Sequence, residues 1–225
     1  MIAIAPNKSN RRNIMLVEDH PIFRHGLAQV IAHDEKLRVC AEVESVAQAM
    51  EAIEQMKPDL VLLDLSLKGS SGMELLKVIR SHYPGVPVLV LSMHDEALYA
   101  ERALRAGASG YLMKQQPPET VREAIHAVLA GEIFLSEQTK TKIVNKALHG
   151  GNREGHSPVE SLSDRELEVL MFTGRGFSTK RIAEELSLST KTIESHRASI
   201  KQKLQLTDMT ALVRFAVEWV SEQGA

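Results

Sequence analysis

The chain has 225 residues, of which 25% are charged and 44% belong to the apolar set, an ordinary composition for a globular protein of one or two domains. No apolar run approaches the roughly 18 residues that a membrane-spanning helix needs, and the apolar start, Met1 to Ala5, has neither the basic segment nor the length of a signal peptide. Cys40 is the single cysteine, which excludes an internal disulfide and suits a reducing compartment. We therefore expect a cytoplasmic protein with no membrane partner.

The net charge of −2 conceals two regions of opposite sign. Residues 13–131 carry 11 Lys and Arg against 16 Asp and Glu, a net charge of −5. Residues 174–205 carry 7 Lys and Arg against 3 Glu, a net charge of +4. An acidic first part and a basic patch near the end predict two different partners.

The first part alternates between strand-like and helix-like segments. Apolar strands are expected near 13–17, 39–43, 60–64, 86–92 and 110–113. Helical patterns fall near 21–33, 46–56, 72–82, 96–106 and 118–130. Five strands and five helices in strict alternation predict an α/β fold with a doubly wound, mainly parallel sheet.

The rest of the chain is predicted to be helical after a linker. Residues 136–148 have the pattern of one more helix, and the stretch from His149 to Pro158 is rich in Gly and charge, which is typical of a linker. From residue 159 onward only helical patterns occur. We therefore expect a first domain over 13–131, a linker with a helix over 132–158, and an all-α domain over 159–225.

The all-α domain has the signals of four helices. Ser163 and Glu166 fit a capping box at the start of the first helix. A short helix is expected after Ser178, and the segment 187–189 breaks it before a longer helix that continues to Leu204. A last helix is expected near 208–222. The short helix, tight turn and longer helix are typical of a helix-turn-helix.

Charged and hydroxyl side chains stand at the ends of four of the five expected strands. Because the carboxyl ends of parallel strands share one edge of the sheet, these groups are expected to form one site. They are Glu18 and Asp19 after the first strand, Asp64 at the end of the third, Ser92 at the end of the fourth and Lys114 after the fifth.

This set of groups suits the transfer of a phosphoryl group to a carboxylate. Asp64 can act as a nucleophile and form an aspartyl phosphate. A hard cation such as Mg²⁺, held beside it by Asp19, alone or with Glu18, would offset the charge of two anionic reactants. Lys114 and Ser92 can each bind a phosphoryl oxygen. A lone aspartate after a strand is more often a helix cap, so the prediction rests on the joint occurrence of these groups.

Residues 13–131 resemble a response-regulator receiver domain. The resemblance is carried by Glu18, Asp19, Asp64, Ser92, Tyr111 and Lys114, with Gly72 and the turn Ala106-Gly107-Ala108. It implies the strand order 2-1-3-4-5 and makes Asp64 the phosphoacceptor. It also implies that the backbone carbonyl of Ser66 completes the metal shell, and that Tyr111 is a switch residue whose ring turns inward when Ser92 moves toward the phosphate.

The chain departs from the receiver pattern at two positions. Lys68 and Gln115 stand where many receivers have proline. Neither change removes a reacting group. The two changes concern the lifetime of the phosphoryl group and the affinity for the metal, which the sequence leaves open. His20 and His94 lie next to the site and are interpreted as loop or helix-start residues, with a modest tuning of the site's charge as the alternative.

Residues 161–206 resemble the LuxR-type DNA-binding domain of the NarL/FixJ family. The resemblance is carried by segments 162–166 and 168–170, Gly176, Ser178, segment 180–183, Leu186, segment 189–196, and Lys203-Leu204. It implies that the helix from Thr190 to Leu204 enters the major groove of double-stranded DNA, with Glu194, Ser195 and Ala198 at base-facing positions. The further DNA-binding residues expected are Lys180, Ser189, Thr190, Lys191, Thr192, Arg197 and Lys201.

Together these patterns predict a two-component response regulator that controls transcription and is not an enzyme. A sensor histidine kinase would phosphorylate Asp64, and the protein would act as a homodimer when phosphorylated or bound to DNA. One alternative is a transcription regulator whose receiver-like domain works without phosphorylation. A phosphatase with an aspartyl intermediate is less compatible, because Ser66 occupies the position where that class has a second acid. An interaction module without nucleic acid would require helices that do not bind DNA.

Overall fold

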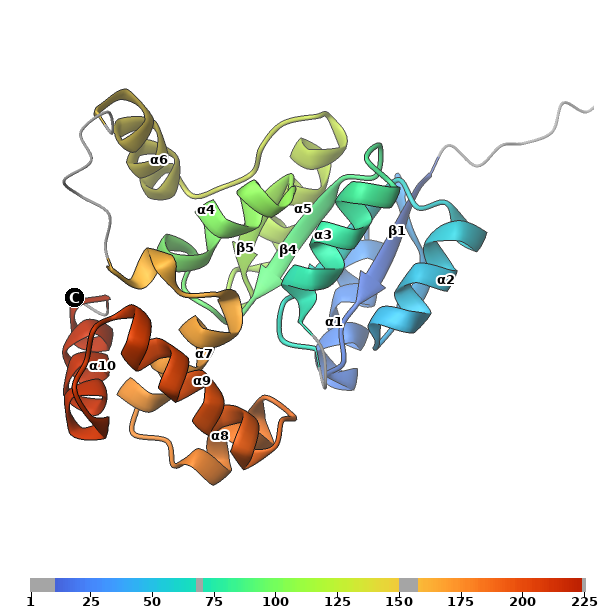
Figure 1. Cartoon of the computed structure of the whole chain (residues 1–225). Coiled ribbons are helices and arrows are strands. Elements are labelled where there is room, and N and C mark those ends of the chain that lie inside the picture. Colours follow the sequence, from blue (N-terminus) through green and yellow to red (C-terminus); the bar gives the residue numbers. More distant parts are fainter. Residues whose placement is uncertain (1–10, 68–70, 150–157, 224–225) are drawn as a thin grey trace, which may run out of the picture. The chain divides into compact units, whose positions relative to one another are not determined.

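The computed structural model describes residues 11–67, 71–149 and 158–223 (Figure 1). The chain divides into two compact units, Met1–Val144 and Asn145–Ala225. Lys68, the segment Met1 to Ala5 and most of the glycine-rich linker stretch lie outside the described residues.

The first unit contains a five-stranded parallel sheet in the order β2-β1-β3-β4-β5, which confirms the predicted fold. The strands are β1 (Arg12–Val17), β2 (Leu37–Val43), β3 (Leu60–Asp64), β4 (Val88–Ser92) and β5 (Gly110–Met113). The fourth strand starts later than the predicted 86–92, because the backbone N–H of Val86 closes a turn onto the carbonyl of Tyr83.

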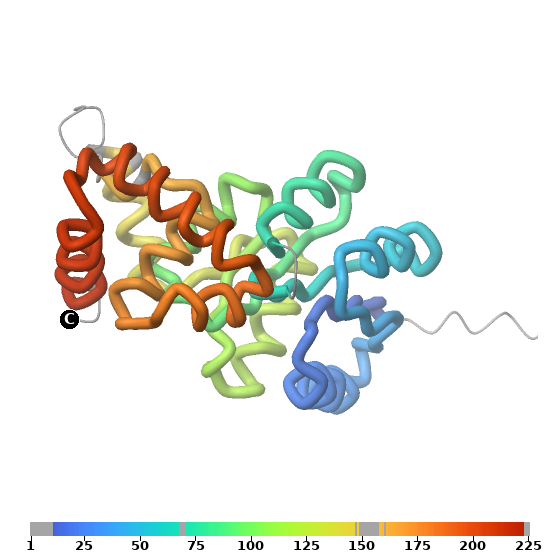
Figure 2. Tube along the Cα trace, turned by 60° about the horizontal axis from the view of Figure 1, so that its bottom comes forward, coloured from blue at the N-terminus to red at the C-terminus, as the bar shows by residue number. Residues whose placement is uncertain are grey.

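Five helices cover the two faces of the sheet (Figures 1 and 2). The helices are α1 (Pro21–Ala32), α2 (Val46–Met56), α3 (Gly72–His82), α4 (Glu96–Ala106) and α5 (Pro118–Leu129). Helix α1 contacts α5, whereas α3 lies between α2 and α4 and contacts both. This arrangement leaves the carboxyl edge of the strands free to form a site.

The core of the first unit lies on both sides of the sheet, as the unbroken apolar runs predict. On the α1 and α5 side, Leu16 and Leu62 pack in one cluster with Ile31 and Ile125. Met15, which alternates with Leu16 along β1, is also fully buried. The strands are therefore rigid supports for the side chains at their ends.

The second unit is helical, as predicted. Its helices are α7 (Asp164–Gly174), α8 (Thr179–Glu185), α9 (Thr190–Lys203) and α10 (Met209–Gln223), preceded by a short 3-10 helix, η1 (Pro158–Ser161). Helix α6 (Glu137–His149) occupies the segment predicted to be helical before the linker. The expected capping box of Ser163 and Glu166 is present, and Ser178 and Ser189 cap α8 and α9.

The core of the second unit joins α7 to α9 and α10. Helix α7 packs against both of these helices, and α8 packs against α9. Ile193 and Ile200 are the buried positions of α9, and Trp219 of α10 is 8% exposed. Ser187, with a φ of 52°, ends the α8 segment and redirects the chain into α9. The remaining face of α9 is polar and largely exposed.

In the part of the chain that the structure describes, none of the helices has the length and apolar character that crossing a bilayer requires.

Candidate functional site

Three carboxylates lie together at the carboxyl edge of the sheet. Glu18 and Asp19 follow β1, and Asp64 is the last residue of the neighbouring strand β3. All three are buried, with exposed fractions of 2%, 5% and 2%. Ligand atoms of these residues and of His20 lie within 4.8 Å of one another. The sheet therefore brings together the acidic groups that the sequence predicts.

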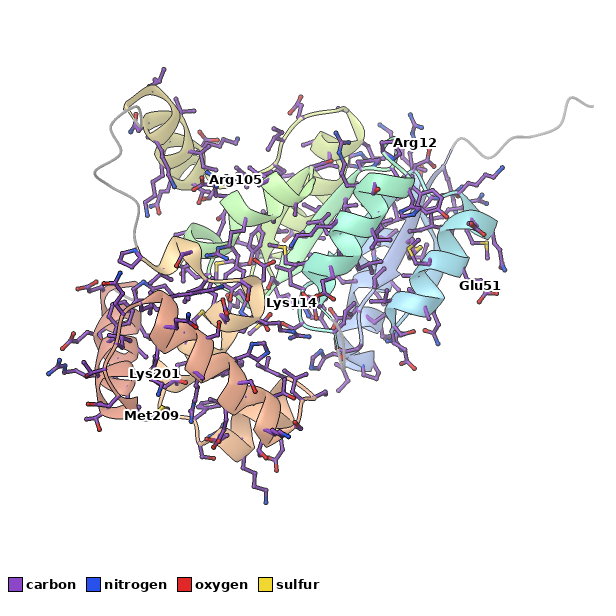
Figure 3. The ribbon with its side chains drawn as sticks, in the orientation of Figure 1. Arg12, Glu51, Arg105, Lys114, Lys201 and Met209 are labelled. Atoms are coloured by element: carbon purple, nitrogen blue, oxygen red, sulfur yellow. The ribbon has the colours of Figure 1, made fainter. Side chains whose placement is uncertain are left out.

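Lys114, which is labelled in Figure 3, follows β5. Its ammonium group lies between two of these carboxylates. Its Nζ lies 2.6 Å from Oε2 of Glu18 and 2.9 Å from Oδ2 of Asp64. The centroid of the Phe23 ring lies 4.6 Å from the same nitrogen, and the Lys114 side chain is 6% exposed. The buried site therefore holds three carboxylates and one ammonium group, an excess of negative charge.

The electrostatics of Asp64 follow from this excess. Burial has the largest effect on the pKa of Asp64 and raises it. The ammonium of Lys114 lowers this pKa, and the carboxylate of Glu18 raises it. The net result is a pKa above the usual value for aspartate. The charged form is thus disfavoured unless more positive charge enters. Oxygen donors in this number are the ligands that hard divalent cations prefer, so the chemistry of the donor set fits Mg²⁺.

Gly72, the first residue of α3, lies against the backbone of Asp64 and Leu65. A Cβ at this position would lie 2.2 Å from the backbone oxygen of Asp64 and 2.5 Å from the Cα of Leu65. The N–H of Gly72 donates to the carbonyl of Leu65 at 3.0 Å, so α3 begins against the end of β3. Only glycine fits there without a shift of the backbone that carries Asp64.

Ser66, Ser92 and Tyr111 are the other residues of the predicted site. The N–H of Ser66 donates to Oδ1 of Asp64 at 3.1 Å. Ser92 is fully buried at the end of β4, and its backbone oxygen accepts from the N–H of Lys114 at 2.9 Å. The ring of Tyr111 is buried, and its hydroxyl donates to the backbone oxygen of His94 at 2.8 Å. The ring of the expected switch residue therefore lies inward in this structure.

The two histidines that flank the site occupy different environments. His20 is exposed, and its Nδ1 lies 2.8 Å from Oδ1 of Asp19 and 3.0 Å from Oε1 of Glu18. His94 is buried, and its ring stacks on Tyr99 with centroids 4.5 Å apart. The contacts of His94 were not predicted from the sequence, because they depend on α4 and on the loop after β3.

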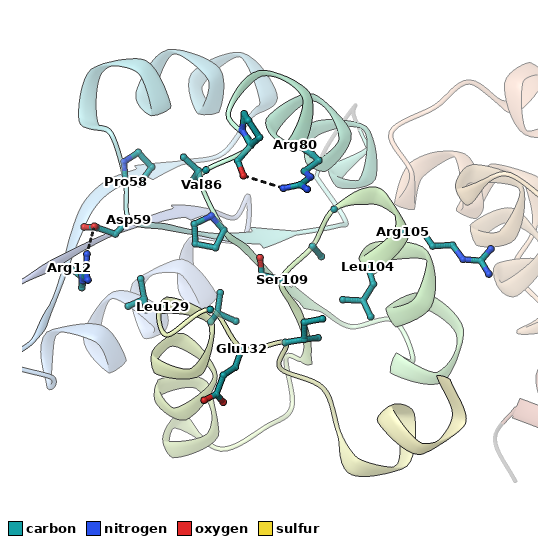
Figure 4. A pocket seen from close by; sticks show the side chains of 18 residues that line it. Arg12, Pro58, Asp59, Arg80, Val86, Leu104, Arg105, Ser109, Leu129 and Glu132 are labelled. Carbon is teal, nitrogen blue, oxygen red and sulfur yellow. Dashed lines mark hydrogen bonds and ion pairs between the residues drawn. The ribbon is translucent and has the colours of Figure 1, made fainter. Parts of the chain in front are cut away.

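Two pockets of the first unit are not lined by the acidic residues Glu18, Asp19 and Asp64. A cavity of about 780 Å³ lies at the opposite edge, where the strands begin, and Figure 4 marks the partners of two of its arginines. Arg12 pairs with Asp59 at 3.0 Å, and Arg80 donates to the carbonyl of Pro84 at 3.1 Å. A mainly apolar groove of about 740 Å³ runs between α1 and α5 and is bordered by Lys114.

In the second unit, the residues predicted to bind DNA are distributed over α8, α9 and their caps. The exposed members of this set are Lys180, Ser189, Thr190, Lys191, Glu194, Ser195 and Ala198. Thr192 and Lys201 are half-buried, and Lys201 on α9 is labelled in Figure 3. The Ser189 hydroxyl accepts from the N–H of Thr192 at 3.0 Å, so this pair also caps the helix.

Arg197 differs from the other predicted DNA-binding residues. Its Nη1 donates to Oγ1 of Thr179 at 2.6 Å and its Nη2 to Oγ1 of Thr173 at 3.3 Å. The guanidinium therefore joins α9 to α7 and α8. Local sequence could not reveal these contacts, because the partners lie 18 and 24 residues away.

Glu166 forms a second connection between α7 and α9 that the sequence did not reveal beyond its capping role. Its carboxylate lies 2.6 Å from Nζ of Lys203 and accepts from Oγ of Ser199 at 2.5 Å. Burial raises its pKa, but the hydrogen bonds from Lys203, Ser199 and Ser163 outweigh burial and lower the pKa to about 2. This paired carboxylate fixes the orientation of α9.

The fold and the site together define a class: a receiver-like sheet with a buried acidic cluster, joined in one chain to a helix-turn-helix unit. Comparison with known families agrees with this. Residues 14–126 match the response regulator receiver domain, and residues 160–216 match the bacterial regulatory proteins of the luxR family.

Individual relatives match nearly the whole chain. The oxygen regulatory protein NreC of Staphylococcus aureus is 33% identical over 209 residues, which cover 91% of this chain and 96% of that protein. NreC of Staphylococcus haemolyticus is 32% identical over the same shares of the two chains.

Solved structures match as well. RcsB from Salmonella enterica serovar Typhimurium, bound to promoter rprA in the presence of the phosphomimetic BeF3−, has a TM-score of 0.60 and 26% identity, covering 92% of this chain and 99% of that chain. A LuxR-family two-component response regulator from Aurantimonas sp. SI85-9A1 has a TM-score of 0.57 and 34% identity over 61% of this chain and 99% of that chain.

The chain belongs to the response regulators that combine a receiver domain with a LuxR-type DNA-binding domain. It is a DNA-binding transcription regulator, as the sequence predicts.

Proposed function

We propose that Asp64 is the residue on which this regulator is phosphorylated, and that a sensor histidine kinase supplies the phosphoryl group. The observation that carries the proposal is the position of Asp64, 2.9 Å from Lys114 in a buried cluster with two further carboxylates. In the transfer, an O–P bond forms at Asp64 and the N–P bond of the donor phosphohistidine breaks. The imidazole leaves and takes a proton from solvent.

Each neighbouring residue has a role in this reaction. Mg²⁺ would be held by Glu18, Asp19, Asp64 and the backbone carbonyl of Ser66. When bound, the cation offsets the negative charge shared by the carboxylate and the phosphoryl group. Lys114 and Ser92 would each bind a phosphoryl oxygen. Burial raises the pKa of the Tyr111 phenol, so this hydroxyl remains a hydrogen-bond donor at neutral pH.

The output of the switch is binding to double-stranded DNA by a homodimer. The phosphoryl group would favour one of two receiver states through Ser92 and Tyr111 and so promote dimerisation or release the DNA-binding unit. Two copies of α9 would then read paired half-sites. The exposed lysines Lys180 and Lys191 support contacts to DNA phosphates. The related RcsB structure bound to a promoter in the presence of a phosphomimetic agrees with this reading.

The test is Mg²⁺-dependent labelling of the full chain by a small phosphodonor, followed by identification of the modified peptide. We expect one label, on Asp64, that disappears when Mg²⁺ is removed by a chelator. Labelling at another residue would show that the wrong acceptor has been assigned. No labelling, combined with normal binding to DNA, would favour a regulator that works without phosphorylation.

A further inference from the structure

His94 contacts both proposed switch residues, Ser92 and Tyr111, although the proposed phosphorylation reaction gives it no role. Its backbone N–H donates to the hydroxyl of Ser92 at 3.1 Å, and its backbone oxygen accepts from Tyr111. The Nε2 atom of its side chain lies 3.2 Å from Oγ of Ser66, and its ring stacks on Tyr99 of α4. With an exposed fraction of 7%, the side chain is buried.

The contact with Tyr99 has a local explanation. Asp95 caps α4, since its side chain accepts from the N–H of Ala97 at 2.7 Å. His94 precedes the cap and Tyr99 is in the first full turn, which is the spacing of a hydrophobic staple that fixes how the chain enters a helix. The interplanar angle of 18° between the rings is that of a stacked pair. The stack alone would make His94 a structural residue.

The contact with Ser66 has no such local explanation. Ser66 lies 28 residues earlier, in the loop after β3, and its N–H donates to Oδ1 of Asp64. Depending on the tautomer of the ring, either the hydroxyl or Nε2 is the donor of the bond. The ring of His94 therefore joins the loop that holds Asp64 to the first turn of α4.

We propose that His94 is a positioning residue that couples the Asp64 loop to helix α4. A change of charge at Asp64 shifts the Ser66 backbone that contacts it, and the His94 ring transmits this shift to Tyr99. This route runs through side chains and is separate from the backbone contacts of His94 with Ser92 and Tyr111. The coupling rests on the proposed function, because the charge change at Asp64 is phosphorylation.

The test is hydrogen exchange of the α4 amides in the full chain, with and without beryllofluoride and Mg²⁺. His94→Phe retains a ring for the stack but loses the nitrogen, and Ser66→Ala loses the hydroxyl but retains the N–H to Asp64. In the ligand-free protein we expect each variant to speed exchange in the first turn of α4 by about fivefold, the effect of one hydrogen bond. The double variant should add nothing further, because both changes remove the same bond.

With beryllofluoride, the wild-type chain should show a change in α4 exchange that both single variants lose. His94→Gln restores a nitrogen near Ser66 but has no ring. In the His94→Gln background, Ser66→Ala should therefore again speed exchange in the first turn of α4. His82→Phe is the matched control and should behave as wild type, because the exposed His82 ring contacts Val78 of its own helix and Tyr83, away from the Asp64 loop.

Two results would overturn the coupling: additive effects of His94→Phe and Ser66→Ala, or variants that melt at a lower temperature but keep the full beryllofluoride response. The second result would mean that His94 only stabilises the start of α4, as a hydrophobic staple, and does not couple it to Asp64. Failure of the proposed function looks different. In that case Asp64 takes no phosphoryl label in the wild-type chain, while the non-additivity in the ligand-free protein persists and still supports the bond between His94 and Ser66.

Discussion

At the sheet edge of the first unit, three buried carboxylates lie together, and the ammonium of Lys114 contacts two of them, those of Glu18 and Asp64. In contrast, the buried carboxylate of Glu166 in the second unit is paired with Lys203 and accepts two further hydrogen bonds. The pKa values follow the same division: burial dominates at Asp64 and raises its pKa, while hydrogen bonds dominate at Glu166 and lower its pKa to about 2. A paired charge holds helices together, and an unbalanced cluster is a place where a cation and an anion can bind.

The largest expected effect tests the unbalanced cluster. Asp64→Asn removes the nucleophilic oxygen, so labelling by a small phosphodonor should fall to background. The matched control is Asp59→Asn, because Asp59 is paired with Arg12 where the strands begin and should not affect labelling. Retained labelling of Asp64→Asn at the wild-type rate would show that another residue is the acceptor.

Gly72→Ala should damage the same site through the backbone. The added Cβ would lie 2.2 Å from the backbone oxygen of Asp64, so the end of β3 or the start of α3 must move. We expect a loss of about 1–3 kcal/mol in the free energy of unfolding and slower labelling of Asp64. Gly85→Ala is the control, since a Cβ there has no neighbour within 4 Å. Calorimetry of the full chain compares the two variants, and equal melting temperatures would refute the steric argument.

Glu166→Gln should destabilise the second unit by about 1–3 kcal/mol, because it removes a charge that Lys203 and Ser199 contact. The pKa of Glu166 is about 2 in the folded chain and 4.5 in its ordinary state, so its stabilising effect is complete above about pH 4.5 and is lost as the pH falls toward 2. Fluorescence of Trp219, the single tryptophan, follows this unit. A difference between variant and wild type that stays constant down to pH 2 would contradict the assignment.

The smallest effect concerns the exposed charges of the second unit. Lys191→Gln should weaken DNA binding by about three- to tenfold and reduce the slope of log affinity against log salt by about 1, as the loss of one phosphate contact requires. Lys36→Gln removes the same charge from the loop between α1 and β2 and should change neither quantity. If the salt slope of Lys191→Gln equals that of wild type, Lys191 does not contact a phosphate.

The two regions also differ in how far their sequence predicts them. Apolar runs, and the rule that parallel strands share their carboxyl edge, predict the strands, the helices and the meeting of Glu18, Asp64 and Lys114. The capping box of Ser163 and Glu166 was predicted as well. The roles of these side chains stay predictions. The order of the strands came from the resemblance to receivers and is confirmed by the structure.

Contacts between distant segments were not predictable in this way. The hydrogen bonds from the Arg197 guanidinium to Thr173 and Thr179 were not predicted, and its contact with DNA stays a prediction. His94 was interpreted as a loop or helix-start residue and lies directly before the cap of α4, but the contacts of its ring with Ser66 and Tyr99 were not predicted. Periodicity reports which face of an element is buried, whereas these contacts depend on which elements meet, and that is set by the whole fold.

The central claim is that a phosphoryl group on Asp64 controls the DNA-binding unit. The most direct measurement is the affinity of the full chain for a genomic DNA fragment that it captures, with and without beryllofluoride and Mg²⁺. We predict that the mimic tightens binding by at least about tenfold, within the usual range of allosteric coupling, and that Asp64→Asn abolishes this gain. Equal affinities of the wild-type chain in both conditions would contradict the account.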